Sequence, residues 1–146
     1  ETKFTPVSSV ASVGYFVGFT DVLATTTLEE PVTLSGTTFT SNATDCVGFV
    51  FDTAATTDVW YAIGVKNDVD TAATALTAPV ADTAVLLRIE LSTAGTATFY
   101  MDGVLVATIA NAVTTTVALT PVVEVMTRTT AVKSVDVDYV FVQQDR

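Results

Sequence analysis

The most regular pattern of hydrophobic and polar positions lies in the second half of the chain. Apolar and polar side chains largely alternate over 85–91 and 96–101, and a third such run covers 104–109. A period of two is typical of a strand with one buried face. Asp102-Gly103 separates the last two runs, and this dipeptide favours a tight hairpin turn whose two central residues need positive φ angles. The pattern predicts three consecutive antiparallel strands.

Shorter runs of the same kind predict further strands. The expected ranges are 13–19, 32–34, 37–40, 46–51, 59–65, 119–127 and 135–142. The sequence shows no amphipathic pattern long enough for a helix between them. Short strands joined by turn signals are typical of an all-β domain. The sequence therefore predicts an all-β fold, a two-sheet antiparallel sandwich of the jelly-roll type.

The alternation also predicts which side chains face the core. In the run 59–65 it places Trp60 on the side opposite the expected core. In the last run it places Tyr139 inward, and Asp136 and Asp138 outward. Trp60 thus becomes a candidate surface aromatic, although it could instead pack under the following loop or in a subunit contact.

Three segments lack a strand pattern. Residues 1–11 are polar with one proline, so we expect an N-terminal arm or linker ahead of a single jelly-roll domain at 12–146. Residues 25–31 predict a polar connection. Residues 67–84 are rich in Ala, Thr and Asp and predict a loop longer than most connections in compact domains, either a contact loop or a mobile one.

Composition supports the prediction of strands and limits the classes of partner that we expect. The 146 residues suit one domain, and they include 29 threonines and 25 valines, which are β-branched and favour strands. Sixteen acids and six scattered bases give a net charge of −10, which argues against nucleic acid as a partner. No apolar run approaches the ~18 residues of a membrane span, so no membrane partner is expected.

The sequence offers few groups for catalysis. It contains no histidine, which excludes Ser–His–Asp and Cys–His catalysis and most zinc hydrolysis. Cys46 is the single cysteine, so no intrachain disulfide can form. Its apolar neighbours predict a buried structural thiol in a chain made in a reducing cytosol.

Several segments together resemble a known family. The runs Leu87–Leu91 and Thr98–Val106, with Gly95 between them, resemble the central hairpin of concanavalin A-like, laminin-G-like jelly rolls. The closing strands of that fold are similar to 119–123 and 135–140 here, and its preceding strands to 45–52 and 58–65. The Thr/Ala-rich, cysteine-poor form resembles the version found in virion proteins of tailed bacteriophages.

The resemblance implies a binding module located in the virion after synthesis in the host cytoplasm. Our first hypothesis is a non-enzymatic structural protein, a capsid decoration or cement-type module. Its loops and N-terminal arm would bind the major capsid protein or other virion subunits. Threonine-rich sheet surfaces and edge strands would join sister subunits into a homo-oligomer, a trimer if it follows the symmetry of capsid sites.

Two other functions remain open. The chain could be a carbohydrate-binding module of a tail or head fibre that contacts host glycans through a patch of Trp60, Arg88, Glu90 and Tyr100, since aromatic and polar side chains together suit sugar stacking. Glucanases of the resembled fold carry Glu-x-Asp-x-x-Glu on one strand. The nearest match here is Asp136-x-Asp138 without a glutamate, so we do not expect an enzyme.

The resemblance also makes a structural calcium ion a candidate ligand, because lectin-like jelly rolls often hold one. Calcium takes six to eight oxygen ligands from carboxylates and carbonyls. Asp45, Asp52, Asp58 and Asp138 are candidates by residue type, but no spacing in the sequence resembles an EF-hand loop. No other cofactor is expected.

Overall fold

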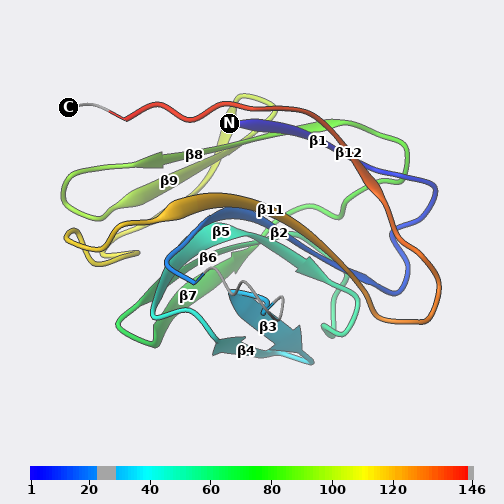
Figure 1. The fold of residues 1–146 in the computed structure, drawn as a ribbon, viewed down its shortest axis with the longest axis horizontal. Coiled ribbons are helices and arrows are strands. Elements are labelled where there is room, and N and C mark those ends of the chain that lie inside the picture. The colour runs from blue at the N-terminus through cyan, green and yellow to red at the C-terminus, as the bar shows by residue number, and fades with distance from the viewer. Residues whose placement is uncertain (23–28, 145–146) are drawn as a thin grey trace.

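The structure is a computed structural model that describes residues 1–22 and 29–144. Two five-stranded antiparallel sheets face each other, and a two-stranded hairpin packs on the far side of one of them (Figure 1). Of the polar connection expected at 25–31, residues 25–28 lie outside the described residues. None of the described segments is a helix capable of crossing a membrane.

The strands follow each other across the sheets in a non-sequential order. Sheet A contains β10 (Val104–Ile109), β9 (Ala97–Met101), β8 (Val85–Leu91), β1 (Thr2–Pro6) and β12 (Val135–Val140). Sheet B contains β11 (Thr120–Thr127), β2 (Val13–Thr20), β5 (Asp45–Asp52), β6 (Tyr61–Lys66) and β7 (Val69–Ala75). The remaining hairpin is β3 (Val32–Ser35) with β4 (Thr38–Ser41). The predicted all-β class is confirmed, and the two facing sheets form a β-sandwich.

The three strands predicted from the central pattern are confirmed as the meander β8-β9-β10. Asp102 and Gly103 have φ angles of 50° and 79°, as a type I′ turn requires. The inward side chains of β9 are buried, and Phe99 is completely so. Ring centroids of Phe99 and Phe49 on sheet B lie 5.2 Å apart, edge to face. This meander therefore anchors sheet A on sheet B.

The main core lies between the two sheets and is centred on Trp60. Its ring packs against Phe4 of sheet A, with centroids 5.7 Å apart, and against Tyr15, Phe49 and Phe51 of sheet B at 5.9, 6.4 and 5.9 Å. All five rings are at most 1% exposed. Aromatic side chains bury roughly 150–250 Å² each, so this cluster supplies a large part of the apolar burial.

A second, smaller core covers the other face of sheet B. Phe16, Val50 and Ile63 point away from sheet A and are covered by the β3–β4 hairpin, which contributes the buried Val32. The central strands β2, β5 and β6 of sheet B are therefore buried on both faces. Sheet A has no such covering layer in the described part of the chain, so its outer face is open to solvent.

The first eleven residues differ from the expected arm or linker. Thr2–Pro6 forms β1, which lies between β8 and β12 within sheet A. Its side chains alternate, and Phe4 is fully buried in the main core. A single large apolar residue in a short polar segment was too weak a pattern to predict this strand.

The long loop expected at 67–84 also differs. Asn67 and Asp68 have φ angles of 51° and 60° and form a two-residue hairpin turn between β6 and β7. The strand Val69–Ala75 then pairs along β6, so only residues 76–84 form a connection. The turn has the backbone of Asn-Gly without its glycine, which concealed it in the sequence.

Strand β12 contains a β-bulge that reverses the predicted orientation of its second half. Val137 pairs with Phe4, Tyr139 pairs with Lys3, and Asp138 has no partner residue. Directly paired residues of an antiparallel sheet share a face. Val137 therefore points inward with Phe4, whereas Tyr139 lies on the outer face with Lys3. The inward orientation predicted for Tyr139 is wrong, because one extra residue shifts a period-two pattern to the other face.

Candidate functional site on sheet A

Three of the four predicted surface residues meet on the outer face of sheet A. Arg88 of β8 and Tyr100 of β9 are directly paired, and the guanidinium carbon lies 3.9 Å from the centre of the tyrosine ring. Glu90 is bound by Arg88 Nη1 at 2.8 Å and accepts a hydrogen bond from the Tyr100 hydroxyl at 3.1 Å. The contacts hold an aromatic ring, a cation and an anion in a fixed arrangement on an exposed sheet.

Trp60, the fourth predicted residue, does not belong to this patch. It is 0% exposed and lies in the main core, with sheet A between it and the Arg88 cluster. The run 59–65, which contains Trp60, has apolar side chains on both faces because its strand is covered on both faces. Alternation alone therefore could not predict which face meets sheet A. Trp60 is packed, but between the two sheets against Phe4 and Tyr15, and not under the following loop as the alternative expected.

The outer face extends across β1 and β12, where no residue was predicted to bind a glycan and Asp138 was considered only as a calcium ligand. The Tyr139 hydroxyl donates to Glu1 Oε1 at 2.8 Å, and Lys3 Nζ binds Asp138 Oδ2 at 2.5 Å. The carboxylate of Glu1 raises the pKa of the Tyr139 hydroxyl above its usual range. The bulge at Asp138, which no sequence signal indicated, brings Tyr139 to this face.

The free edge of sheet A, along the end of β12 and residues 141–142, exposes apolar side chains on either side of the charged Asp138. We call Val137, Tyr139, Val140, Phe141 and Val142 the edge strip; they are 38%, 41%, 50%, 57% and 48% exposed. The ladder to β1 continues beyond β12, because Phe141 and Glu1 exchange two backbone hydrogen bonds of 2.8 Å. Strand β12 is the last strand of sheet A, so its other edge is unpaired within the described chain.

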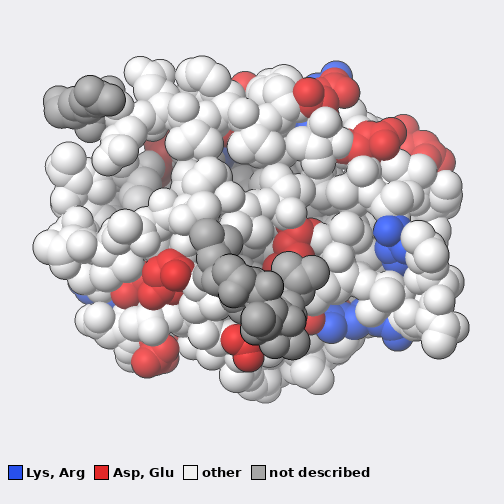
Figure 2. Space-filling view, viewed as in Figure 1, with Lys and Arg blue, Asp and Glu red and all other residues white. Residues whose placement is uncertain are grey.

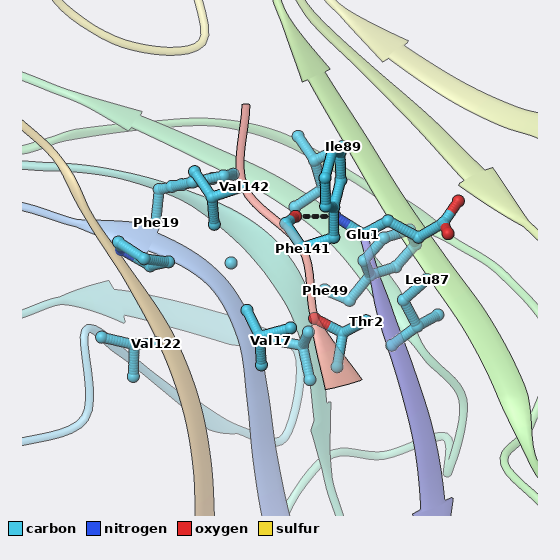
Figure 3. A pocket seen from close by; sticks show the side chains of 13 residues that line it. Glu1, Thr2, Val17, Phe19, Phe49, Leu87, Ile89, Val122, Phe141 and Val142 are labelled. Atoms are coloured by element: carbon cyan, nitrogen blue, oxygen red, sulfur yellow. Dashed lines mark hydrogen bonds between the residues drawn. The ribbon is translucent and has the colours of Figure 1, made fainter. Parts of the chain in front are cut away.

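An apolar cleft opens beside the edge strip, between the edges of the two sheets (Figure 3). Val140 and Val142 line one side of it, and Val17 and Phe19 of β2 line another. Its remaining lining includes Leu87 and Ile89 of β8 and Pro121 and Val122 of β11. The sandwich is thus incompletely closed along the β11 and β12 edges.

The four aspartates considered for calcium have separate environments. Asp45 is fully buried and accepts a hydrogen bond from the Thr114 backbone at 2.5 Å, whereas Asp58 is exposed. Asp52 is bound by Arg128, and Asp138 by Lys3. In the residues that the structure describes, no three acidic, cysteine or histidine side chains are arranged to hold a metal ion.

A charged cluster on the outer side of sheet B holds the third layer in place. Arg128 binds both carboxylate oxygens of Glu30 at 2.7 Å and also binds Asp52. These hydrogen bonds raise the pKa of the guanidinium. Gly14 leaves room for it, since a Cβ there would lie 3.2 Å from Arg128 Nη2. The arginine thus joins residue 30, ahead of β3, to the end of β5.

Glu124 lies beside this cluster and is only 9% exposed. Neither carboxylate oxygen has a hydrogen-bond partner in the structure. Burial, assisted by the negative charge of Glu30, raises its pKa to about 7, although Arg128 acts in the opposite direction. Sequence analysis missed it, yet a single acid within the apolar run 122–126 is a signal that could have been followed.

Charge is unevenly distributed over the surface. In Figure 2, acidic side chains gather mostly toward the right and lower parts of the view. Among the described residues, the upper left of the view, where Figure 1 shows the C-terminal segment, carries few charges.

Comparisons with known protein families, curated proteins and solved structures give no match for this chain. The function of the chain is therefore inferred from the surfaces of sheet A.

Proposed function

We propose that this chain is a non-enzymatic virion structural protein, a capsid decoration or cement-type module. In this proposal the sandwich is a concanavalin A-like jelly roll of the tailed-bacteriophage kind. The edge strip carries the proposal, because an unpaired strand edge with exposed apolar side chains is a template for association. Such an edge favours assembly with other subunits.

The outer face of sheet A suits a broad contact with a capsid shell. Arg88 is paired with Glu90 and Lys3 with Asp138, so a partner need not neutralise these four charges, although Asp136 on the same face has no ion pair in the described chain. Exposed ion pairs of this kind contribute little to stability, about 0–1 kcal/mol each, which leaves the face available for recognition. Since residues 2–6 form β1, we assign the shell contact to this face and not to an N-terminal arm.

The first experiment is immunogold labelling of intact particles from the source of this chain. Label over the head supports the decoration role, and particles lacking the protein should then lose resistance to heat or low salt. Label at the tail would favour a glycan-binding role instead. Label on no particle would contradict a virion role altogether.

The second candidate function is glycan binding, favoured by the arrangement of Tyr100, Arg88 and Glu90. A tyrosine ring with neighbouring hydrogen-bonding groups suits a sugar, although Arg88 already covers one side of this ring. A glycan array with Tyr100→Ala tests it, and Leu105→Ala on the paired position of β10 is the matched control. Binding lost only in Tyr100→Ala supports a lectin, whereas no binding by the unaltered chain eliminates it for the glycans on the array.

A further inference from the structure

We propose that two copies of this chain associate through antiparallel pairing of residues 139–143, the end of β12 and the segment that continues it, with a two-fold axis at Phe141. Sheet A of one copy then continues into sheet A of the other. This inference rests on the proposed function as an assembly module and names a second copy as the partner of the edge strip. The pairing closes as a dimer, in place of the trimer suggested by capsid symmetry.

The hydrogen bonds of the C-terminal segment determine the register. Phe141 directs its backbone N–H and C=O toward Glu1, with both bonds 2.8 Å long. Successive residues of an extended strand direct these groups to opposite edges. Val140 and Val142 therefore present theirs to the free edge. In the proposed pairing Val140 of one copy exchanges bonds with Val142 of the other, and the two Phe141 residues face each other.

The segment is symmetric about Phe141, as a two-fold contact requires. A contact of this kind pairs each patch with itself, and Val140-Phe141-Val142 has the same sequence in both directions. Val140 and Val142 of one copy meet Val142 and Val140 of the other. The inward side chains of these valines cover the cleft shown in Figure 3. The pairing buries apolar side chains that are 50% and 48% exposed in a single copy.

Charge favours this place for contact between copies. The chain has a net charge of −10, so like charges oppose self-association over most of its surface. Tyr139 to Gln143 carries no charge, and in the proposed register these residues pair only with one another. An axis at Tyr139 would instead bring Asp138 and its bulge into the pairing. With the axis at Phe141, neither Asp138 nor the bulge falls within the paired segment 139–143.

Cysteine cross-linking tests the register. Facing residues of a non-hydrogen-bonded pair have Cα atoms about 4.5 Å apart, within disulfide range. Phe141→Cys should therefore form a disulfide dimer with oxidised glutathione, and the fully buried Cys46 cannot compete. Leu105→Cys is the control, because Leu105 lies on the opposite edge of sheet A and is also 57% exposed. Equal cross-linking of the two variants overturns the proposal.

A second pair of positions checks the antiparallel direction. Tyr139 of one copy should face Gln143 of the other, so neither single cysteine variant should cross-link with itself. The double variant Tyr139→Cys/Gln143→Cys should cross-link readily. Cross-linking by the single Tyr139→Cys variant as strong as that of Phe141→Cys would place the axis elsewhere and overturn the register.

Sedimentation equilibrium tests the association itself. Val142→Pro removes an N–H that serves only the free edge, so it should leave the stability of the single chain unchanged. By symmetry two hydrogen bonds are lost, and the dimer dissociation constant should rise by about tenfold or more. The unaltered dimer should tighten as salt is added, because salt screens the net negative charge.

The outcomes separate this inference from the proposed function. A chain that stays monomeric in high salt at all accessible concentrations, yet still labels particles, overturns the dimer and leaves the virion role standing. A dimer with the expected cross-links that labels no particle supports the dimer and contradicts the virion role.

Discussion

Glu124 shows how one residue can make the stability of this protein depend on pH. Its carboxyl is buried without a hydrogen-bond partner beside Glu30, and its pKa is raised from 4.5 to about 7. Between these two pKa values the folded chain holds a proton that the unfolded chain releases. The stability of the fold therefore falls as the pH rises from about 4.5 to 7, and the loss is complete above that range.

Glu124→Gln should accordingly stabilise the protein in mildly alkaline solution but not in acid. We expect a gain of about 2 kcal/mol in the free energy of unfolding at about pH 8, and almost none at about pH 4. Urea unfolding at both pH values measures it. Glu29→Gln, an exposed neighbour of the same cluster, is the control and should show no such pH dependence. An equal gain at both pH values would show that charge at residue 124 is not the cause.

Trp60 provides a second test at the same scale, since the sequence left both a surface position and a packed position open for it. Trp60→Ala should lower the free energy of unfolding by about 3–5 kcal/mol, because it removes the centre of the aromatic core. Arg88→Ala on the outer face should cost less than about 1 kcal/mol. Urea unfolding followed by circular dichroism compares the two. A mild effect of Trp60→Ala would be inconsistent with a tryptophan at the centre of the aromatic core.

At the scale of single elements, two hairpins of the same geometry differ by one glycine. The β9–β10 turn is Asp102-Gly103, whereas the β6–β7 turn is Asn67-Asp68, and both residues of each turn have positive φ. A left-handed conformation costs an ordinary residue roughly 1–2 kcal/mol, which glycine avoids. Asp68→Gly should therefore raise the free energy of unfolding by about 0.5 kcal/mol, after the greater freedom of glycine in the unfolded chain is offset.

The reciprocal change gives the control for that prediction. Gly103→Asp gives the β9–β10 hairpin the less favourable residue, and it should lower the free energy of unfolding by a similar amount. A Cβ at position 103 meets nothing within 4 Å, so the effect would arise from the backbone and not from a clash. If both changes shift stability in the same direction, turn conformation is not the controlling term.

These hairpins also show how far sequence patterns lead. Strands β8, β9 and β10 were predictable because one face is buried, one is wet, and the turn carries glycine. Strand β7 was not, because its turn lacks glycine. The facing of Trp60 was not predictable either, since a strand with two buried faces has no polar side to mark it. At the candidate site, Arg88, Glu90 and Tyr100 could be grouped by alternation, but Tyr139 depended on an unforeseen bulge.

At the scale of the whole molecule, the outer face and the free edge of sheet A are suited to different contacts. The outer face carries Tyr100 and the ion pairs Arg88–Glu90 and Lys3–Asp138, whereas none of the side chains of the edge strip is charged. The outer side of sheet B is covered by the β3–β4 layer, which Arg128 holds in place. We therefore propose a division of roles, in which the outer face meets a shell and the edge meets a sister copy.

This division can be tested with two variants that leave the core intact. Arg88→Ala/Tyr100→Ala removes the outer-face cluster, and we expect it to weaken binding to particles by about tenfold, the effect of losing about 1.4 kcal/mol of contact energy. Its self-association should not change. Val142→Pro should do the opposite, weakening self-association while each copy keeps its affinity for the particle. Co-sedimentation with particles lacking the protein, across a range of concentrations, gives both quantities.

The exposed Asp58→Asn, at the turn before β6, is the control and should alter neither property. Loss of particle binding in Val142→Pro at concentrations where the unaltered chain is monomeric would mean that the edge strip also contacts the shell. Unchanged binding by the Arg88→Ala/Tyr100→Ala variant would eliminate the outer face as the shell contact. Because each exposed cluster contributes little to folding, either result would reflect recognition and not a loss of structure.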